Sequence, residues 1–302
     1  MESSRPAATV LAVFERTPPR LVLERCREAD IVLTNKVAFD AVTIRGLPRL
    51  VYLGVTATGY DHICLEAARA RGIVVTNVPV YGTSSVAQFV FALLLELCHH
   101  VGLHDGAVHA GEWSRSEDFS FWKRPTVELE GKTMGIIGFG RIGRKVGELA
   151  HAFGMAVLAC DPRRGQAPGY EPFAWASVEE AFSRGDVVSL NCALTPGNRG
   201  MVNASLLAAM KPTAFLINAA RGGLVEESDL AAALEAGRIA GAAVDVASRE
   251  PIAADNPLLR APNCIITPHI AWASLESRRR LKEASIENLR AFLAGRPRNR
   301  VA

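Results

Sequence analysis

Short apolar runs alternate with amphipathic segments along the first hundred residues. The apolar runs are rich in β-branched residues and predict strands, whereas the segments between them have the three-to-four-residue spacing of helices. The predicted strands are residues 9–14, 31–34, 50–54 and 73–76, and the predicted helices are residues 21–29, 39–45 and 61–71. Strands that alternate with helices in this way predict a parallel sheet with helices on its faces.

A long apolar helix is predicted next, over residues 84–101, and an irregular segment follows it. The helix is apolar on more than one face, so we expect it to be buried on more than one side. Residues 105–130 have little periodicity and carry four large aromatic residues: Trp113, Phe119, Phe121 and Trp122. A long aromatic arm is typical of an interface between subunits. A surface loop folded onto its own domain is the equal alternative.

The alternation of strands and helices begins again at Lys132. The predicted strands are residues 133–137, 156–160, 187–190, 214–218, 240–246 and 264–267. The predicted helices are residues 141–153, 177–183, 203–210, 227–236 and 274–293. Six strands with helical crossovers match one complete doubly wound domain that binds a dinucleotide.

Two α/β domains with parallel sheets are therefore expected, in agreement with a length of 302 residues. We place residues 1–98 and 284–302 in a substrate domain and residues 99–283 in a dinucleotide-binding domain. The chain crosses between these domains twice, so a hinge that closes over the substrate is expected.

Composition narrows the class of protein further. Apolar residues make up 49% of the chain and charged residues 22%, which excludes a disordered or fibrous protein. The net charge is only +3, so general nucleic-acid binding is not expected. No run approaches the ~18 apolar residues of a membrane span. The apolar run 7–14 ends at Glu15-Arg16 and is interpreted as a strand and not as a signal peptide.

The six cysteines form no C-x-x-C pair, and most lie in apolar segments. Buried free thiols in a reducing cytoplasm are the preferred interpretation. His100 and His104 have the i,i+4 spacing of a metal-binding pair, but no neighbouring carboxylate or cysteine completes a ligand set. No metal site is predicted.

The strongest local motif is Gly138-Phe139-Gly140-Arg141-Ile142-Gly143, between a predicted strand and a predicted helix. Glycines at these positions permit a tight turn and a close approach of the backbone to a pyrophosphate, which the helix N-terminus attracts. The next strand ends at Asp161, 18 residues beyond Gly143, near the ~20-residue spacing of a ribose-binding acid. A carboxylate there favours NAD, whereas Arg163 and Arg164 leave NADP open.

Candidate catalytic residues follow three predicted strands of the same sheet. Arg221 comes just after residues 214–218, Glu250 after 240–246, and His269 after 264–267. Ligands of doubly wound sheets bind outside the carboxyl ends of the strands. Arginine can bind a carboxylate through two hydrogen bonds, and a glutamate can orient an imidazole and keep it charged. Together the three residues predict a redox site for an oxyacid.

These residues resemble those of the D-isomer-specific 2-hydroxyacid dehydrogenases, and the resemblance covers nearly the whole chain. It rests on GFGRIG, Asp161, INAARGGLVEE, AAVDV with REP, and TPHIAW, together with VTATGYDHI and NVPVYGTSSVAQ. The segments WSRSEDFSFW and HIAWAS are most similar to the glycerate dehydrogenase, or hydroxypyruvate reductase, branch. The resemblance implies a flavodoxin-like substrate domain, a Rossmann NAD-binding domain, and hydride transfer between NAD(P) and a small 2-oxo or 2-hydroxy acid such as hydroxypyruvate or glyoxylate.

The resemblance also implies a role for each matching residue. His269 corresponds to the general acid/base, Glu250 to the acid that orients it, and Arg221 to the arginine that holds the substrate. Thr58 and Gly59 match a loop whose backbone amides bind the substrate carboxylate. The implied cofactor contacts are Gly138, Gly140, Arg141, Ile142, Gly143, Asp161, Ala219, Ala220, Asp245 and Trp272. The apolar helix over residues 84–101 and the aromatic arm predict a homodimer that buries both, and the resemblance implies that Trp122 of the partner reaches the substrate pocket.

The chain departs from the family pattern at two places. Asn191-Cys192-Ala193 stands where many members have His-x-Pro, and Ala247 replaces a frequent phenylalanine. Two other functions stay open at this point: phosphoglycerate dehydrogenase, and a dinucleotide-sensing, corepressor-like binding protein on the same fold. The lack of an evident basic cluster in the substrate domain argues against the first, and the lack of long disordered extensions argues against the second.

Overall fold

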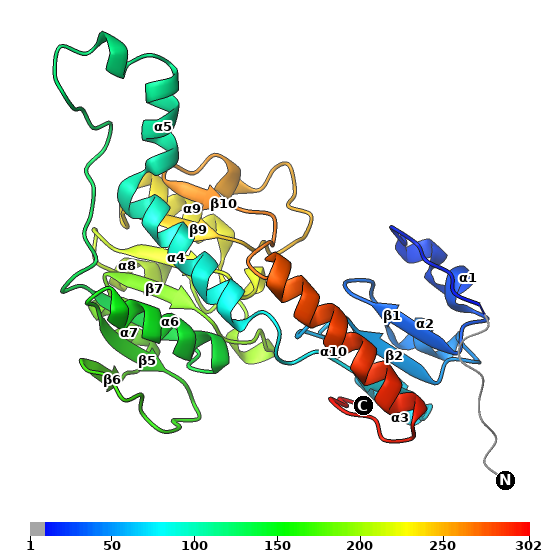
Figure 1. Cartoon of the computed structure of the whole chain (residues 1–302). Coiled ribbons are helices and arrows are strands. Elements are labelled where there is room, and N and C mark those ends of the chain that lie inside the picture. The colour runs from blue at the N-terminus through cyan, green and yellow to red at the C-terminus, as the bar shows by residue number, and fades with distance from the viewer. Residues whose placement is uncertain (1–9) are drawn as a thin grey trace. The chain divides into compact units, whose positions relative to one another are not determined.

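The structure is a computed structural model that describes residues 10–302. The chain forms two compact units. The smaller unit joins the chain up to Tyr81 with Leu275–Ala302, and the larger unit is Gly82–Ser274 (Figure 1).

The smaller unit is built on a parallel three-stranded sheet in the order β1-β2-β3. Its strands are β1 (Ile31–Thr34), β2 (Tyr52–Val55) and β3 (Val74–Thr76), and its helices are α1 (Val22–Cys26), α2 (Ala41–Arg45), α3 (Leu65–Ala70) and α10 (Leu275–Leu293). Fully buried apolar side chains such as Phe39, Ile44 and Leu53 form its core. Beyond α10, residues near Arg300 turn back and pair antiparallel with β3 at Thr76.

The strand predicted at residues 9–14 is wrong for the part that the structure describes, and Thr9 lies outside the described residues. Residues 10–14 form no strand, and Val10 and Leu11 are 84% and 85% exposed. β-Branched residues favour strands only where a neighbouring strand and a packed face complete them. The apolar run lacks both.

The larger unit carries a seven-stranded parallel sheet in the order β10-β9-β8-β7-β4-β5-β6, the order of a dinucleotide-binding domain with one added edge strand. Its strands are β4 (Thr133–Ile137), β5 (Ala156–Cys160), β6 (Phe173–Trp175), β7 (Val187–Leu190), β8 (Phe215–Asn218), β9 (Gly241–Val244) and β10 (Cys264–Ile266). The sequence analysis missed β6, because a strand of three residues, the middle one exposed, is too short to show a period.

Helices cover both faces of this sheet. On one face, α4 (Thr83–His99) and α6 (Arg141–Ala152) pack on strand residues such as Ile136 and Ile217. On the other face, α7 (Val178–Arg184), α8 (Ala204–Ala209) and α9 (Glu227–Glu235) pack on alternate strand residues such as Val188 and Leu216. Strands that are buried on both faces consist of continuous apolar runs. Such runs are easy to recognise in a sequence, so most strands of this sheet were predicted close to their observed bounds.

The division of the chain differs from the expected boundaries at 98/99 and 283/284. Helix α4 belongs to the larger unit, because its buried face, including Val90 and Leu94, packs on that unit's sheet. Helix α10 belongs to the smaller unit. Its Asn288 donates to the Asn77 carbonyl (2.8 Å), and its Arg280 donates to the Tyr81 carbonyl (2.9 Å).

The predicted arm begins with a helix, α5 (Val101–His109), which leads away from the sheet of the larger unit, and a long loop then returns to that sheet (Figure 1). Phe119 is 91% exposed and Trp122 73% exposed. His104 donates to the His100 carbonyl (2.8 Å) and accepts from the Lys123 amide (3.0 Å), so its ring ties the returning loop to α5.

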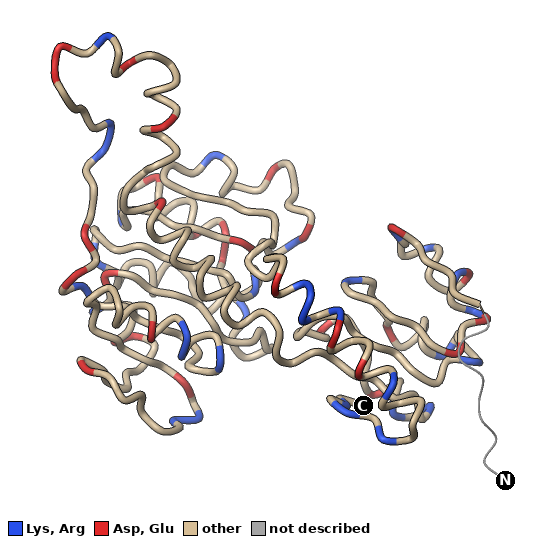
Figure 2. Tube along the Cα trace, in the orientation of Figure 1, with Lys and Arg blue, Asp and Glu red and all other residues tan. Residues whose placement is uncertain are grey.

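Acidic and basic residues are interspersed along both units (Figure 2). The basic end of the chain is partly engaged within its own unit, since Arg298 pairs with Glu287 (3.1 Å) and Arg300 donates to the Ala302 carbonyl (2.7 Å). Among residues 10–302, no single helix is long and apolar enough to cross a membrane. The pair α4 and α5 passes that test together by length and composition, with a bend of 58°.

Candidate active site

The glycine-rich turn between β4 and α6 has the geometry of a dinucleotide cradle. Gly138 has a φ of +92°, and a Cβ there would lie 2.6 Å from the Cys192 nitrogen. A Cβ on Gly143 would lie 2.0 Å from the Gly138 carbonyl oxygen, so this glycine lets α6 pack tightly against the turn. Gly140 is exposed at the start of α6 and has open space where a Cβ would be. That space, in front of the free N–H groups of α6, fits a pyrophosphate.

Asp161 lies at the carboxyl end of β5, directly beside this turn. One carboxylate oxygen accepts from the Phe139 amide (2.9 Å) and the other from the Arg163 amide (2.9 Å). The two hydrogen bonds fix the carboxylate against the cradle. Carboxylate oxygens have further lone pairs, so hydroxyl groups of a ribose can still donate to Asp161.

The structure brings together the predicted catalytic pair. His269 Nδ1 lies 2.7 Å from Glu250 Oε2, and the two side chains are 22% and 37% exposed. A hydrogen bond from Nδ1 to a carboxylate leaves Nε2 as the nitrogen that is open to a substrate. Arg221 follows β8 in the same sheet, and its guanidinium donates to the Ala220 carbonyl (2.8 Å).

A buried carboxylate holds the loop that carries His269. Asp245 is fully buried after β9, and one of its oxygens accepts from the Thr267 hydroxyl (2.7 Å) and the Ile270 amide (2.8 Å). The other oxygen accepts from the Ala271 amide (2.8 Å). Charged acceptors form stronger hydrogen bonds than neutral ones, so these contacts fix the backbone on both sides of His269. The family resemblance implies only a cofactor contact for Asp245, and that contact stays a prediction.

His269 has an unusual backbone, with a φ of +57°. A left-handed conformation costs a residue other than glycine about 1–3 kcal/mol and persists only where the surroundings enforce it. Here the Trp272 indole donates to the His269 carbonyl (2.9 Å), in addition to the Asp245 contacts. Trp272, which is expected to contact the cofactor, therefore supports the loop that carries His269.

The loop that carries Glu250 is held against the Arg221 turn. A Cβ on Gly222 would lie 1.9 Å from the Ala247 carbonyl carbon, so only glycine permits this approach. Glu227, at the start of α9, accepts from the Ser248 amide (2.7 Å) and the Ser248 hydroxyl (2.6 Å). The sequence missed Glu227 because an acid in the first turn of a helix is ordinary.

Thr58 and Gly59 lie in the smaller unit, just after β2. The Thr58 hydroxyl donates to the Val78 carbonyl (2.9 Å). The remaining predicted residues have the following places: Arg141 is exposed and Ile142 half-buried in the first turn of α6, Ala219 and Ala220 are half-buried after β8, and Trp122 is exposed on the arm.

The segment that departs from the family pattern passes beside the cradle. The Asn191 side-chain amide donates to the Ser189 carbonyl (3.1 Å) and to the Ser189 hydroxyl (3.0 Å), and its side-chain oxygen Oδ1 is buried without a partner among the described residues. Burial raises the pKa of the Cys192 thiol, so it stays protonated at neutral pH. No group of three or more metal-ligating side chains occurs within residues 10–302.

Comparison with known proteins agrees with this geometry. The family model "D-isomer specific 2-hydroxyacid dehydrogenase, NAD binding domain" matches residues 91–271. A hydroxypyruvate reductase of Blautia hydrogenotrophica is 48% identical over 92% of this chain and 86% of its own length. A glycerate dehydrogenase of Methylorubrum extorquens is 39% identical over 93% of this chain and 88% of its own length.

Two solved structures share the fold at 29% identity. An acyclic imino acid reductase in complex with NADPH and D-Arg has a TM-score of 0.85 and covers 95% of this chain and 90% of its own. The D-lactate dehydrogenase of Aquifex aeolicus, complexed with NAD and lactic acid, has a TM-score of 0.82 and covers 90% of this chain and 85% of its own.

The chain belongs to the D-isomer-specific 2-hydroxyacid dehydrogenase family. It is an NAD(P)-dependent oxidoreductase of the branch that contains glycerate dehydrogenases and hydroxypyruvate reductases. The family, the α/β fold class and the enzyme class predicted from the sequence are confirmed.

Replacing Gly222 tests whether the close approach of the two loops matters for catalysis. In Gly222→Ala the new methyl group must push Ala247 and its neighbours away. This displacement should move the Glu250 carboxylate away from the His269 imidazole. We expect kcat for glyoxylate reduction to fall at least ~10-fold, because small misplacements of catalytic groups are costly. Gly223→Ala is the matched control, since its Cβ would meet only side-chain ends of Leu194 and Arg199. Equal kcat values for the two variants, both folded by circular dichroism, would refute this role.

Proposed function

We propose that His269 is the general acid/base, that Glu250 orients it, and that Arg221 binds the oxygen atoms of the substrate. The observation that carries this proposal is the 2.7 Å contact between His269 and Glu250 at the carboxyl edge of the sheet. The dinucleotide cradle and Arg221 belong to the same edge. Doubly wound sheets bind their ligands there, which supports one combined site.

The chemistry divides between cofactor and protein. The reduced nicotinamide, when bound, supplies the hydride that reaches the carbonyl carbon of a 2-oxo acid. His269 donates a proton from Nε2 to the carbonyl oxygen, so the C=O bond becomes a secondary or primary alcohol. The Arg221 guanidinium offsets the negative charge that develops on that oxygen. In the reverse direction, neutral His269 accepts the hydroxyl proton.

Loss of the acid should slow the chemical step. In His269→Ala we expect kcat to fall by ~10²–10⁴-fold, the usual contribution of a general acid. Glu250→Gln should lower kcat less, because the amide oxygen can still accept from Nδ1 and keep the imidazole oriented. Steady-state reduction of glyoxylate with NADH measures both. Wild-type turnover in His269→Ala would remove this assignment.

We propose hydroxypyruvate and glyoxylate as the substrates that the enzyme reduces. The names of the relatives support them, and further relatives include glyoxylate reductases, for example that of Pyrococcus furiosus at 38% identity. Phosphoglycerate dehydrogenase and a corepressor-like binding protein are not favoured. Rates of NADH and NADPH oxidation with a panel of 2-oxo acids, with and without a phosphate group, distinguish these three functions.

We propose NAD as the preferred cofactor. The Asp161 carboxylate, fixed beside the cradle, would repel the 2′-phosphate of NADP. Asp161→Ala should therefore raise kcat/KM with NADPH relative to NADH, because Arg163 and Arg164 remain to attract the phosphate. Initial rates with each cofactor measure this ratio. A wild-type preference for NADPH would contradict the role of Asp161.

We propose a homodimer in which the exposed arm is buried against a second copy. Phe119 and Trp122 are large apolar side chains that are more than 70% exposed, and self-complementary apolar patches favour two-fold dimers. The six free cysteines support a reducing compartment such as the cytoplasm.

The arm can be tested in two steps. Light scattering at micromolar concentration should give twice the 32.4 kDa of one chain, and a monomer would contradict the dimer. Trp122→Ala should raise KM for the oxo acid and leave KM for NADH nearly unchanged, if Trp122 reaches the partner's substrate pocket. Wild-type values of both constants would restrict Trp122 to the interface.

A further inference from the structure

We infer that Asn77 is a positioning residue for the substrate, because it fixes the loop that contains Thr58 and Gly59. The inference rests on the proposed function, together with the role in binding the substrate carboxylate that the family resemblance implies for that loop. Asn77 lies just beyond β3 and is 7% exposed. Its side-chain amide donates to the Thr58 carbonyl (2.8 Å).

The loop is held by its carbonyl groups. The Thr56 carbonyl accepts from the Asn35 side chain (2.8 Å), the Ala57 carbonyl from the Val78 amide (3.0 Å), and the Thr58 carbonyl from Asn77. Three consecutive carbonyls are thus bound from the protein side.

Because the peptide bond is planar, the hydrogen bonds to these carbonyls also fix the directions in which the N–H groups point. In a trans peptide group the C=O and N–H bonds point in opposite directions. A fixed Ala57 carbonyl therefore fixes the direction of the Thr58 N–H, and a fixed Thr58 carbonyl that of the Gly59 N–H. Neither N–H donates to any group among the residues that the structure describes. Two neighbouring free N–H groups suit a carboxylate.

The backbone of Asn77 is itself held by two hydrogen bonds. Its amide donates to the Asn299 carbonyl (3.1 Å), and its carbonyl accepts from the Asn288 side chain (2.8 Å). Asn288, 2% exposed on α10, in turn accepts from the Asn299 side chain (2.8 Å). These contacts hold the backbone of Asn77 at both its N–H and its C=O, so the side chain that reaches the Thr58 carbonyl starts from a fixed backbone.

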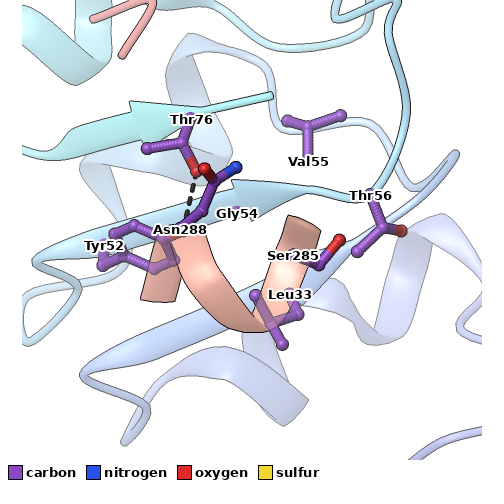
Figure 3. Close-up of a pocket in the computed structure, with 8 residues that line it drawn as sticks. All are labelled: Leu33, Tyr52, Gly54, Val55, Thr56, Thr76, Ser285 and Asn288. Carbon is purple, nitrogen blue, oxygen red and sulfur yellow. Dashed lines mark hydrogen bonds between the residues drawn. The ribbon is translucent and has the colours of Figure 1, made fainter. Parts of the chain in front are cut away.

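A second buried hydrogen bond in the same unit supplies a matched control. Tyr52 and Thr76 share a hydrogen bond of 2.7 Å, and together with Asn288 they line one small cavity (Figure 3). Tyr52→Phe therefore removes a buried hydrogen bond close to Asn77 without touching Thr58. An Asn77 variant loses the hydrogen bond to the Thr58 carbonyl, whereas Tyr52→Phe loses a hydrogen bond to the Thr76 side chain.

The experiment compares Asn77→Ala, Asn77→Asp and Tyr52→Phe in steady-state reduction of glyoxylate and hydroxypyruvate. We expect KM for both oxo acids to rise about tenfold in the Asn77 variants, with KM for NADH within about twofold of wild type. A carboxylate contact serves ground state and transition state alike, so kcat should change little. Asn77→Asp keeps the side-chain shape but has no N–H donor. It carries the test if Asn77→Ala does not fold.

Amide hydrogen exchange distinguishes two failures: that Asn77 does not hold the loop, and that the loop does not bind the substrate. The Thr56 amide, which donates to the Thr34 carbonyl (2.7 Å), should exchange faster in Asn77→Ala and at the wild-type rate in Tyr52→Phe. Unchanged exchange and unchanged KM would overturn the positioning role. Faster exchange with an unchanged KM would overturn the assignment of Thr58 and Gly59 to the substrate. An equal rise of KM in Tyr52→Phe would show a general loss of stability and would also overturn the inference.

Discussion

The candidate site depends on one buried carboxylate more than on any other group. Asp245 gathers the Thr267 hydroxyl and the Ile270 and Ala271 amides, and so determines the path of the backbone through His269. That path includes a left-handed residue, which the chain would not adopt without enforcement. Leaving a buried donor unpaired costs about 1–3 kcal/mol. Three donors share the Asp245 carboxylate, and their hydrogen bonds together offset the local strain.

Hydrogen bonds between a polar side chain and the backbone of a neighbouring loop occur at two other places as well. Glu227 fixes the loop of Glu250 through the backbone and side chain of Ser248, and Asn77 fixes the loop of Thr58 through a carbonyl. In each case a polar side chain from one element binds the backbone of a neighbouring loop. Loops carry the chemistry of this fold, and rigid elements supply the side chains that hold them.

The parallel sheet explains how three distant segments form one site. Every strand of the larger sheet runs in the same direction, so the residues that follow β8, β9 and β10 reach the same edge. The cradle at Gly138 follows β4 and belongs to that edge too. Glycines at 138, 143 and 222 are required because one backbone passes close to another at each of these positions. This requirement explains why glycines recur in the motifs that were noted in the sequence.

Prediction from the sequence succeeded where burial or close packing leaves a pattern. Strands β4, β5 and β7 were predicted residue for residue, since both faces of each are buried. The strand at residues 10–14 was wrong because strand propensity needs a partner, and β6 was missed because it is short. Arg221, Glu250 and His269 were predicted as site residues from their places after strands, and the structure has all three after strands of one sheet; their roles stay a prediction.

The supporting residues could not be found in that way. Asp245, Glu227 and Asn77 act through hydrogen bonds to backbone atoms that are near only in the folded chain. A single buried polar residue has no period and no spacing that would distinguish it from a capping or turn residue. The extent of the smaller and larger units was likewise set by packing, through the apolar face of α4 and the polar face of α10.

The most direct test of this account is the rate of a single turnover in Asp245→Asn. The variant keeps the size of the side chain but replaces one acceptor oxygen by an NH₂ group, which faces an N–H or O–H donor of the His269 loop. The account predicts that enzyme preloaded with NADH and mixed with glyoxylate oxidises the NADH at least ~10²-fold more slowly than wild type, because the proton donor is displaced. A single-turnover rate equal to that of wild type, in a folded variant, would contradict the claim that Asp245 places His269.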